Sequence, residues 1–194
     1  MRKRNGYTLT ELLTVLAILG MITLATVPAF TNLRRRSAVR AAAGTMRSIF
    51  HLTRSRAIAR NVYCGLKFQK SGDRWTFAVY EDGDRDGIRN DDIKRGIDRR
   101  IGLPREVLDG SSLVSIGLPG SKIKDPDGDA LQPHASPVQF GRSTICSFSP
   151  LGEATSGTIY LTARGRDLWA VRVYGATAKM RVLRYDAEAK RWTP

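Results

Sequence analysis

The most extended pattern in the chain is a stretch of uncharged, mostly apolar residues close to its start. No charged residue occurs between Leu12 and Leu33, a run of 22 residues. As a helix this run would be about 33 Å long, which is enough to span the hydrocarbon core of a bilayer. Pro28 lies inside the run and predicts a kink or a local loss of helix, because proline removes one helical hydrogen bond. The pattern predicts a transmembrane or stem helix over residues 7–33.

A second helical pattern follows directly. Between Arg34 and Asn61 the chain has eight arginines and no acid. One side of the expected helix is mostly apolar at 3.6-residue spacing and carries Val39, Met46, Ile49, Phe50, Thr53 and Ala57. A stripe of arginines runs along its edge: Arg36, Arg40, Arg47 and Arg54. We expect an amphipathic stem helix over residues 34–61 that packs on a sheet, with the arginines either solvated or in contact with anionic lipid headgroups or a partner subunit.

From Val62 onward the pattern becomes short and alternating, which is typical of strands separated by glycine and proline clusters. The final three expected strands suggest an antiparallel meander. The sequence therefore predicts an α+β fold, in which the long N-terminal transmembrane and stem helix packs on a small antiparallel β-sheet head over residues 62–194. The expected strands are Val62–Phe68, Trp75–Glu81, Ser112–Gly117, Pro137–Phe140, Thr158–Thr162, Leu168–Tyr174 and Met180–Tyr185.

Composition and charge narrow the function classes. The net charge is +14, but residues 1–61 carry +10 and residues 164–194 carry +5, whereas residues 62–163 carry −1. The basic balance therefore reflects the two ends of the chain and does not by itself indicate nucleic acid. Two cysteines and two histidines exclude a disulfide-dense scaffold and a histidine-rich centre. Because no nucleophile–base pair or phosphate-binding motif occurs either, the sequence predicts that the protein is not an enzyme.

The junction between the basic opening and the apolar run is itself informative. The basic stretch Met1–Gly6 is followed by Tyr7-Thr8-Leu9-Thr10-Glu11. A secretory signal peptide would have a shorter apolar region followed by a small-residue cleavage site. An ordinary membrane anchor gains nothing from a carboxylate at Glu11, because a charge near an apolar helix is costly. Neither of these readings accounts for the junction.

The segment from Gly6 to Leu13 resembles instead the processing site of type IV pilins and type II secretion pseudopilins. The resemblance implies that a prepilin peptidase cleaves between Gly6 and Tyr7, so that residues 1–6 are a leader and Tyr7 becomes the methylated N-terminal residue. The usual residue there is Phe, so Tyr7 is a conservative departure. Glu11 stands at the family's assembly position, and Pro28 stands at the family's spacing from the cut.

A second stretch extends the resemblance. Arg54, Ser55, Ala57, Ile58, Arg60 and Asn61 are similar to the stem-to-sheet junction of the GspH/FimT family. The resemblance implies a structural minor pseudopilin of a type II secretion system that assembles into a short periplasmic filament. Its implied partners are other pseudopilins or pilins, the prepilin peptidase and the inner membrane. Arginines flank both sides of the apolar run, so charge leaves the orientation open, whereas the family implies a single-pass protein with a cytoplasmic N-terminus and a periplasmic head.

The resemblance also carries an alternative function. FimT-like minor pilins of type IV pili bind DNA during uptake, and in that branch a Gly-Arg-x-Arg motif near the C-terminus is the expected carrier. The matching stretch here, Ala178–Arg181, keeps positive charge at Lys179 and Arg181 but lacks the glycine. DNA contact at these two residues is therefore the alternative to charges that serve only solubility.

An acidic loop offers candidate metal ligands. Asp82, Asp84 and Asp86 alternate ahead of Gly87, as in a loop that binds Ca²⁺ through carboxylate oxygens and turns at a glycine. Further oxygens would come from Asn90, Asp91 and Asp92, although the spacing is one residue shorter than in the common loop. The loop is either ordered by Ca²⁺, as in a calcium-binding, adhesin-like pilin head, or is a solvated hairpin tip. A second cluster, Asp125, Asp127 and Asp129, lacks downstream acids.

The two cysteines allow a disulfide. Cys64 lies on the first expected strand and Cys146 lies near a later one, and an extracytoplasmic head permits their pairing. Closing this long loop would contribute up to about 4–5 kcal/mol in the chain-entropy model. The sequence favours a Cys64–Cys146 disulfide over two buried thiols.

Overall fold

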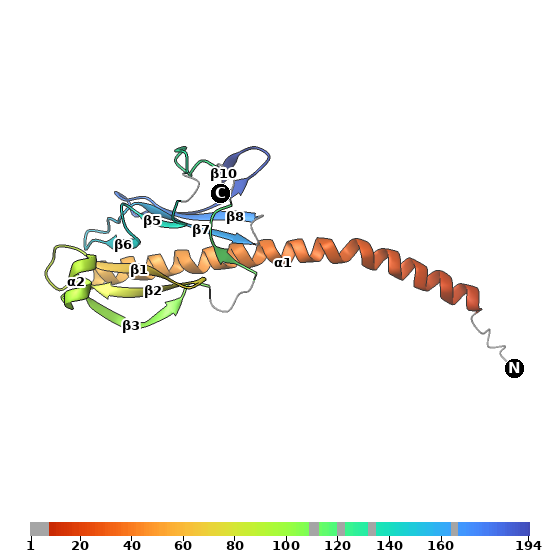
Figure 1. The fold of residues 1–194 in the computed structure, drawn as a ribbon, viewed down its shortest axis with the longest axis horizontal. Coiled ribbons are helices and arrows are strands. Elements are labelled where there is room, and N and C mark those ends of the chain that lie inside the picture. Colours follow the sequence, from red (N-terminus) through yellow and green to blue (C-terminus); the bar gives the residue numbers. More distant parts are fainter. Residues whose placement is uncertain (1–7, 109–112, 120–122, 132–134, 164–166) are drawn as a thin grey trace.

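The N-terminal part of the protein is one continuous helix. A computed structural model describes residues 8–108, 113–119, 123–131, 135–163 and 167–194. Helix α1 extends from Leu9 to Arg60, 52 residues, and ends at Asn61 in the left-handed conformation with φ of 52°. The helix continues across position 28, so the local loss of helix expected at Pro28 is not observed. The helix instead bends gently in its N-terminal part (Figure 1). It stays continuous because the turns on both sides of a proline can keep their own hydrogen bonds.

The C-terminal half of α1 supplies the centre of the core. Its apolar face is fully buried or nearly so at Val39, Ala43, Met46, Phe50, Thr53 and Ala57. The ring of Phe50 lies 6.1 Å from that of Phe68, 5.7 Å from that of Phe140 and 6.3 Å from that of Phe148. The amphipathic pattern of residues 34–61 therefore identified the face that packs on the head.

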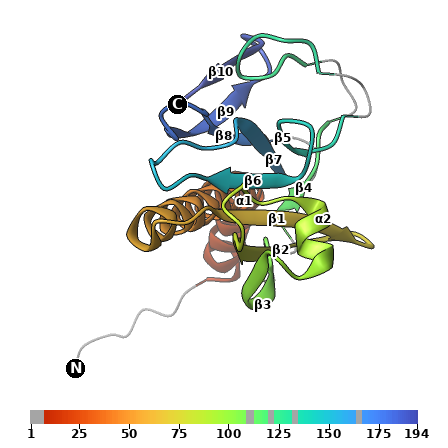
Figure 2. The same cartoon turned by 90° about the vertical axis from the view of Figure 1, so that its left-hand side faces the viewer.

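Two antiparallel sheets pack against this helix (Figure 2). The first has the order β3-β2-β1-β6, and the second has the order β10-β9-β8-β7-β4 with β5 paired to β7. The strands of the first sheet are β1 Cys64–Ser71, β2 Arg74–Glu81, β3 Arg99–Glu106 and β6 Ile145–Phe148. Those of the second are β4 Ser115–Ile116, β5 Val138–Phe140, β7 Gly157–Ala163, β8 Asp167–Val173, β9 Met180–Asp186 and β10 Arg191–Thr193.

The fold class predicted from the sequence is confirmed as an α+β arrangement of an N-terminal helix with antiparallel sheets. All seven expected strands have a counterpart, and β7, β8 and β9 form the expected meander. Three strands and one short helix, α2 Asn90–Arg95, were not expected. In the part of the chain that the structure describes, no helix combines the length and the apolar character needed to cross a membrane.

Candidate assembly helix and acidic loop

The N-terminal half of α1 projects away from the head (Figure 1). From Leu9 to Leu24 its large apolar side chains are between 53% and 80% exposed. They point in every direction around the helix, at Leu12, Leu13, Val15, Leu16, Ile18, Leu19, Met21 and Ile22. A helix that is apolar all round is stable only when protein or lipid surrounds it, and an exposed apolar surface of this kind marks an interaction site.

Glu11 is held by the residue that caps this helix. Its Oε2 atom accepts hydrogen bonds from the backbone N–H of Thr8 at 2.9 Å and from the Thr8 hydroxyl at 3.0 Å. In return, the Thr8 hydroxyl accepts one from the backbone N–H of Glu11 at 3.3 Å. Together these bonds form a capping box, which satisfies backbone donors that a helix start leaves unpaired. Gly6 and Tyr7, the residues of the predicted cleavage junction, lie outside the described residues.

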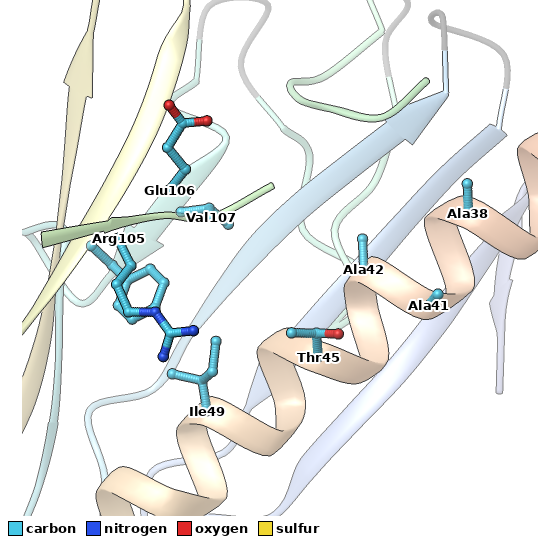
Figure 3. Close-up of a pocket in the computed structure, with 9 residues that line it drawn as sticks. Ala38, Ala41, Ala42, Thr45, Ile49, Arg105, Glu106 and Val107 are labelled. Atoms are coloured by element: carbon cyan, nitrogen blue, oxygen red, sulfur yellow. The ribbon is translucent and has the colours of Figure 1, made fainter. Parts of the chain in front are cut away.

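A groove runs between α1 and the end of β3 (Figure 3). Three alanines and Thr45 of the helix form one wall, and Arg105, Glu106 and Val107 form the other. The groove has a volume of about 610 Å³.

A second groove, of about 620 Å³, contains most of the arginine stripe. Arg36, Arg40 and Arg47 reach it from α1, and Arg184 reaches it from β9. Asp167 is the carboxylate that pairs with this set, at 3.7 Å from Arg36 and 3.9 Å from Arg184. The stripe therefore borders the second sheet as a basic surface open to solvent.

The acidic loop after β2 folds around Asp82. The Asp82 carboxylate accepts backbone N–H groups from Asp84 at 2.9 Å, Arg85 at 2.8 Å and Gly87 at 2.9 Å. Burial by itself would raise the pKa of Asp82, but these donors outweigh it and lower the pKa. The fold brings one oxygen each of Asp82, Asp84 and Asp86 within 4.8 Å of one another, which no other acidic, histidine or cysteine triple does among the described residues.

The other predicted ligands are placed differently. Asp92 is buried, with its carboxylate 3.1 Å from Arg95. Asp91 is exposed and pairs with Lys94 at 3.5 Å, so the expectation that it joins the loop carboxylates is wrong. The reason is helical geometry, because Asp91 and Asp92 are consecutive residues of α2 and point about 100° apart. Asn90 is exposed and begins α2.

Sequence reasoning missed Asp98, which is only 2% exposed and lies against the loop. Its Oδ2 atom accepts the backbone N–H of Arg89 at 3.0 Å. Burial raises the pKa of Asp98, and the carboxylates of Asp82 and Asp92 raise it further, while the backbone N–H groups of Arg89 and Gly83 oppose that shift. The pKa of Asp86 is also raised, by desolvation first and then by Asp84.

The second acidic cluster has a simpler explanation. Asp125 accepts the backbone N–H groups of Asp127 at 2.9 Å and Asp129 at 2.8 Å, and Asp127 pairs with Arg172. This is a turn closed by its own first carboxylate.

Cys64 and Cys146 are separate buried thiols, so the predicted disulfide is not formed. Cys64 lies opposite Phe148, whereas Cys146 lies opposite Leu66, so the two cysteines are diagonal neighbours on β1 and β6. Diagonal neighbours are about 7–8 Å apart, which is too far for a disulfide without backbone movement. Burial raises the pKa of Cys64 to about 11, and burial also raises the pKa of Cys146, so both thiols are protonated and unreactive.

The two candidate DNA contacts share one exposed face. Lys179 and Arg181 are both exposed and flank the buried Met180. The Arg181 guanidinium lies over the ring of Tyr174, 5.9 Å from its centroid, and Arg172 lies over the same ring at 5.5 Å. The result is a small cationic surface with one aromatic ring.

A helix that is exposed and apolar in its first half, and that packs one face against a β-rich head in its second half, is typical of the class of pilin-like subunits. Comparison with protein families agrees with this class: residues 1–27 match the prokaryotic N-terminal methylation motif, and residues 42–177 match the type II transport protein GspH. The chain belongs to the GspH family, so the resemblance seen in the sequence is confirmed. Members of this family are structural pseudopilins of the type II secretion and pilus systems. No curated protein and no solved structure matches the chain.

Proposed function

We propose that this protein is a structural minor pseudopilin of a type II secretion system, anchored first in the inner membrane and then assembled into a short periplasmic filament. One observation carries the proposal. In a single helix, one face is buried against the head from Val39 onward, whereas the large apolar side chains from Leu9 to Leu24 are more than half exposed. That division is what a subunit needs when its helix moves from lipid into a filament of similar helices.

The proposed assembly step follows from the physical chemistry of that helix. Lipid tails and neighbouring apolar helices are equally apolar, so the transfer between them has little hydrophobic driving force. Polar groups must then direct the transfer of the helix from lipid into the filament. Cleavage after Gly6 would leave an ammonium at Tyr7, and pairing of that charge with the Glu11 carboxylate of a neighbouring subunit would fix the register, since an unpaired charge in an apolar core is costly. The other subunits of the filament are therefore its main partners.

The proposed topology places the N-terminus in the cytoplasm and the head in the periplasm, in a single pass of residues 7–33. It rests on the prepilin type of the leader, whose peptidase acts on the cytoplasmic side. The polymerisation helix would thus comprise residues 7–33, the amphipathic stem residues 34–61, and the head residues 62–194.

Replacement of Gly6 by leucine is expected to block processing, because a bulky side chain at the cleavage junction obstructs the peptidase. Mass spectrometry of protein from the membrane fraction should show full-length Gly6→Leu chains, whereas the unaltered protein should lack residues 1–6 and carry a methyl group on Tyr7. Gly20→Ala is the matched control, because an added Cβ at Gly20 meets no atom within 4 Å. Cleavage found between residues 25 and 29 would mean an ordinary signal peptide and contradict the proposal.

DNA binding during uptake is the second candidate function, and the exposed cationic face of Lys179 and Arg181 beside Tyr174 favours it. Two such charges can neutralise about two phosphates, which predicts weak binding that falls with salt and does not read bases. Full-length protein in detergent micelles should then bind duplex DNA in the micromolar range at low salt. The double variant Lys179→Ala, Arg181→Ala should lose this binding.

The matched control removes the same charge from the other sheet, by Arg99→Ala with Arg100→Ala, and should bind as the unaltered protein does. Binding with these properties would support the DNA-uptake branch. Absence of binding at low salt, or equal losses in both double variants, would contradict a DNA site at Lys179 and Arg181.

A further inference from the structure

The groove between α1 and the second sheet begins where the apolar run of the chain ends. Leu33 is the last residue of that run, and it lines the groove. Beyond it, Arg36, Arg40 and Arg47 line the same wall, and all three are exposed. They lie within about 40° of one another around the helix, because each residue advances by about 100°. The arginines therefore form one row that starts beside the apolar segment.

The opposite wall comes from the second sheet. Arg184 of β9 adds a fourth cation to the groove, and Trp169 of β8 lies opposite it in the strand register. The indole Nε1–H of Trp169 and the Nε–H of Arg184 are buried, and neither has an acceptor among the described residues. Donors without an acceptor are costly, so this wall favours a negative group in its neighbourhood.

The protein balances only part of this positive charge. Asp167 pairs with one arginine of each wall, at 3.7 Å and 3.9 Å, which is longer than the usual 2.7–2.9 Å or so of a charge-assisted hydrogen bond. In the part of the chain that the structure describes, no carboxylate forms an ion pair with Arg40 or Arg47. Even with the carboxyl group of Pro194 counted, the four arginines outnumber the negative groups by two. The groove therefore attracts an anion.

The distance of each arginine from the apolar run indicates what kind of anion it meets. At about 1.5 Å per residue, Arg36 lies about 4.5 Å beyond Leu33 along the helix, Arg40 about 10.5 Å and Arg47 about 21 Å. Side chains of a helix point back toward its N-terminus, so these arginines reach toward the apolar segment. The headgroup layer of a leaflet is about 5–8 Å thick. With the apolar run in a bilayer, the first two arginines reach the headgroups and the third lies in water.

We propose that this groove binds the phosphate group of an anionic phospholipid from the leaflet that surrounds the end of the apolar helix. A guanidinium group pairs with two phosphate oxygens at once, and a tryptophan such as Trp169 suits the boundary between membrane and water. A zwitterionic lipid fits less well, because its headgroup brings a cation of its own. The inference rests on the proposed anchoring of residues 7–33 in the membrane and adds a lipid partner to it.

The test titrates the full-length protein in neutral detergent micelles with phosphatidylglycerol or with phosphatidylcholine of the same acyl chains. Native mass spectrometry counts the lipids that stay bound. We expect tighter binding of phosphatidylglycerol. A basic residue near an anionic surface contributes about a factor of five, so Arg36→Gln with Arg40→Gln should weaken that binding about thirtyfold. Equal affinities of the unaltered protein for the two lipids would overturn the proposal.

The matched control removes two charges from the first sheet. Arg99→Gln with Arg100→Gln changes residues that are exposed, as Arg36 and Arg40 are, and should bind phosphatidylglycerol as tightly as the unaltered protein does. Equal losses in both double variants would mean that net charge alone attracts the lipid. That result would overturn a site in the groove.

Arg47→Gln and inorganic phosphate distinguish a lipid headgroup from a free anion. Because Arg47 lies beyond the headgroup layer, its replacement should leave the affinity for phosphatidylglycerol nearly unchanged. Inorganic phosphate in large excess should not displace the lipid, whose acyl chains also lie against the apolar helix. A loss in Arg47→Gln as large as in the double variant, or displacement by phosphate, would assign the groove to a free anion and overturn the assignment to lipid.

Localisation in cells distinguishes the groove from the anchoring on which it rests. Arg36→Gln with Arg40→Gln should still be cleaved after Gly6 and found in the membrane fraction, because the apolar helix provides the anchor. Absence of the unaltered protein from the membrane fraction would contradict the anchoring, whatever the titration in micelles shows. Normal localisation of the unaltered protein together with equal affinities for the two lipids would contradict the lipid site alone.

Discussion

Glu11→Ala is expected to leave the protein in the membrane fraction but to remove it from filaments. Membrane insertion does not need the carboxylate, since alanine is cheaper than a charge in an apolar helix. Assembly does need it if Glu11 pairs with the N-terminal ammonium of a neighbour, because loss of one member of a buried ion pair costs about 3–5 kcal/mol. At about 1.4 kcal/mol for each factor of ten, incorporation should fall by a factor between about 10² and about 4 × 10³. Quantitative immunoblots of sheared filament and membrane fractions measure both quantities.

Glu11→Gln separates the two roles that the structure allows for this residue. A glutamine can still close the capping box with Thr8, whereas it carries no charge for a neighbouring ammonium. If charge pairing directs assembly, Glu11→Gln should fail as Glu11→Ala does. Normal incorporation of Glu11→Gln would mean that Glu11 acts by capping its own helix, and the proposed pairing with Tyr7 would be wrong.

Phe50→Ala is expected to have the largest effect on the stability of the head. Phe50 is fully buried and its ring contacts those of Phe68, Phe140 and Phe148. Truncation of a buried phenylalanine costs about 3–5 kcal/mol, a large part of the 5–15 kcal/mol that usually stabilises a folded protein. Denaturation by urea in detergent micelles, followed by tryptophan fluorescence, should show a midpoint shifted strongly to lower urea.

Leu52→Ala is the control for that measurement. Leu52 belongs to the same helix, two residues from Phe50, but its side chain is 72% exposed. Its truncation should change the free energy of unfolding by no more than about 0.5 kcal/mol. Equal destabilisation by both variants would mean that α1 is weakened as a helix, and the packing role of Phe50 would be contradicted.

The elements that could be predicted from the sequence are those whose apolar residues recur at a regular helical or strand spacing. Val39, Met46 and Phe50 lie at helical intervals, and strands such as β8 alternate between buried and less buried residues. Strand β3 has no such pattern, because four of its eight residues are charged and seven are exposed. Strand β3 forms because its backbone pairs with β2. Such pairing leaves no pattern in the spacing of apolar residues. Strands β6 and β10 are only four and three residues long, too short for a periodic signal.

The acidic loop was predictable only in part, for a related reason. Asp82, Asp84 and Asp86 are close in the chain, so local spacing revealed them. Asp98 reaches the loop because the chain turns after α2 at Gly96, whose φ is 77°. Likewise, only the register of β1 against β6 shows that Cys64 and Cys146 are diagonal neighbours, out of disulfide range. Contacts that arise from register or from a reversal of the chain leave no periodic trace.

The shared core of α1 and the two sheets has a consequence for synthesis. The ribosome makes residues 39–57 early, but β9, which packs on this helix, ends at Asp186. At about 5–20 residues per second, this apolar face of α1 stays uncovered for roughly 6 to 26 s after its synthesis. During that delay an apolar stripe lies open on a nascent chain, and such stripes promote aggregation unless charges flank them. The arginines beside it are well placed for that, because like charges keep two unfinished chains apart until the final strands arrive.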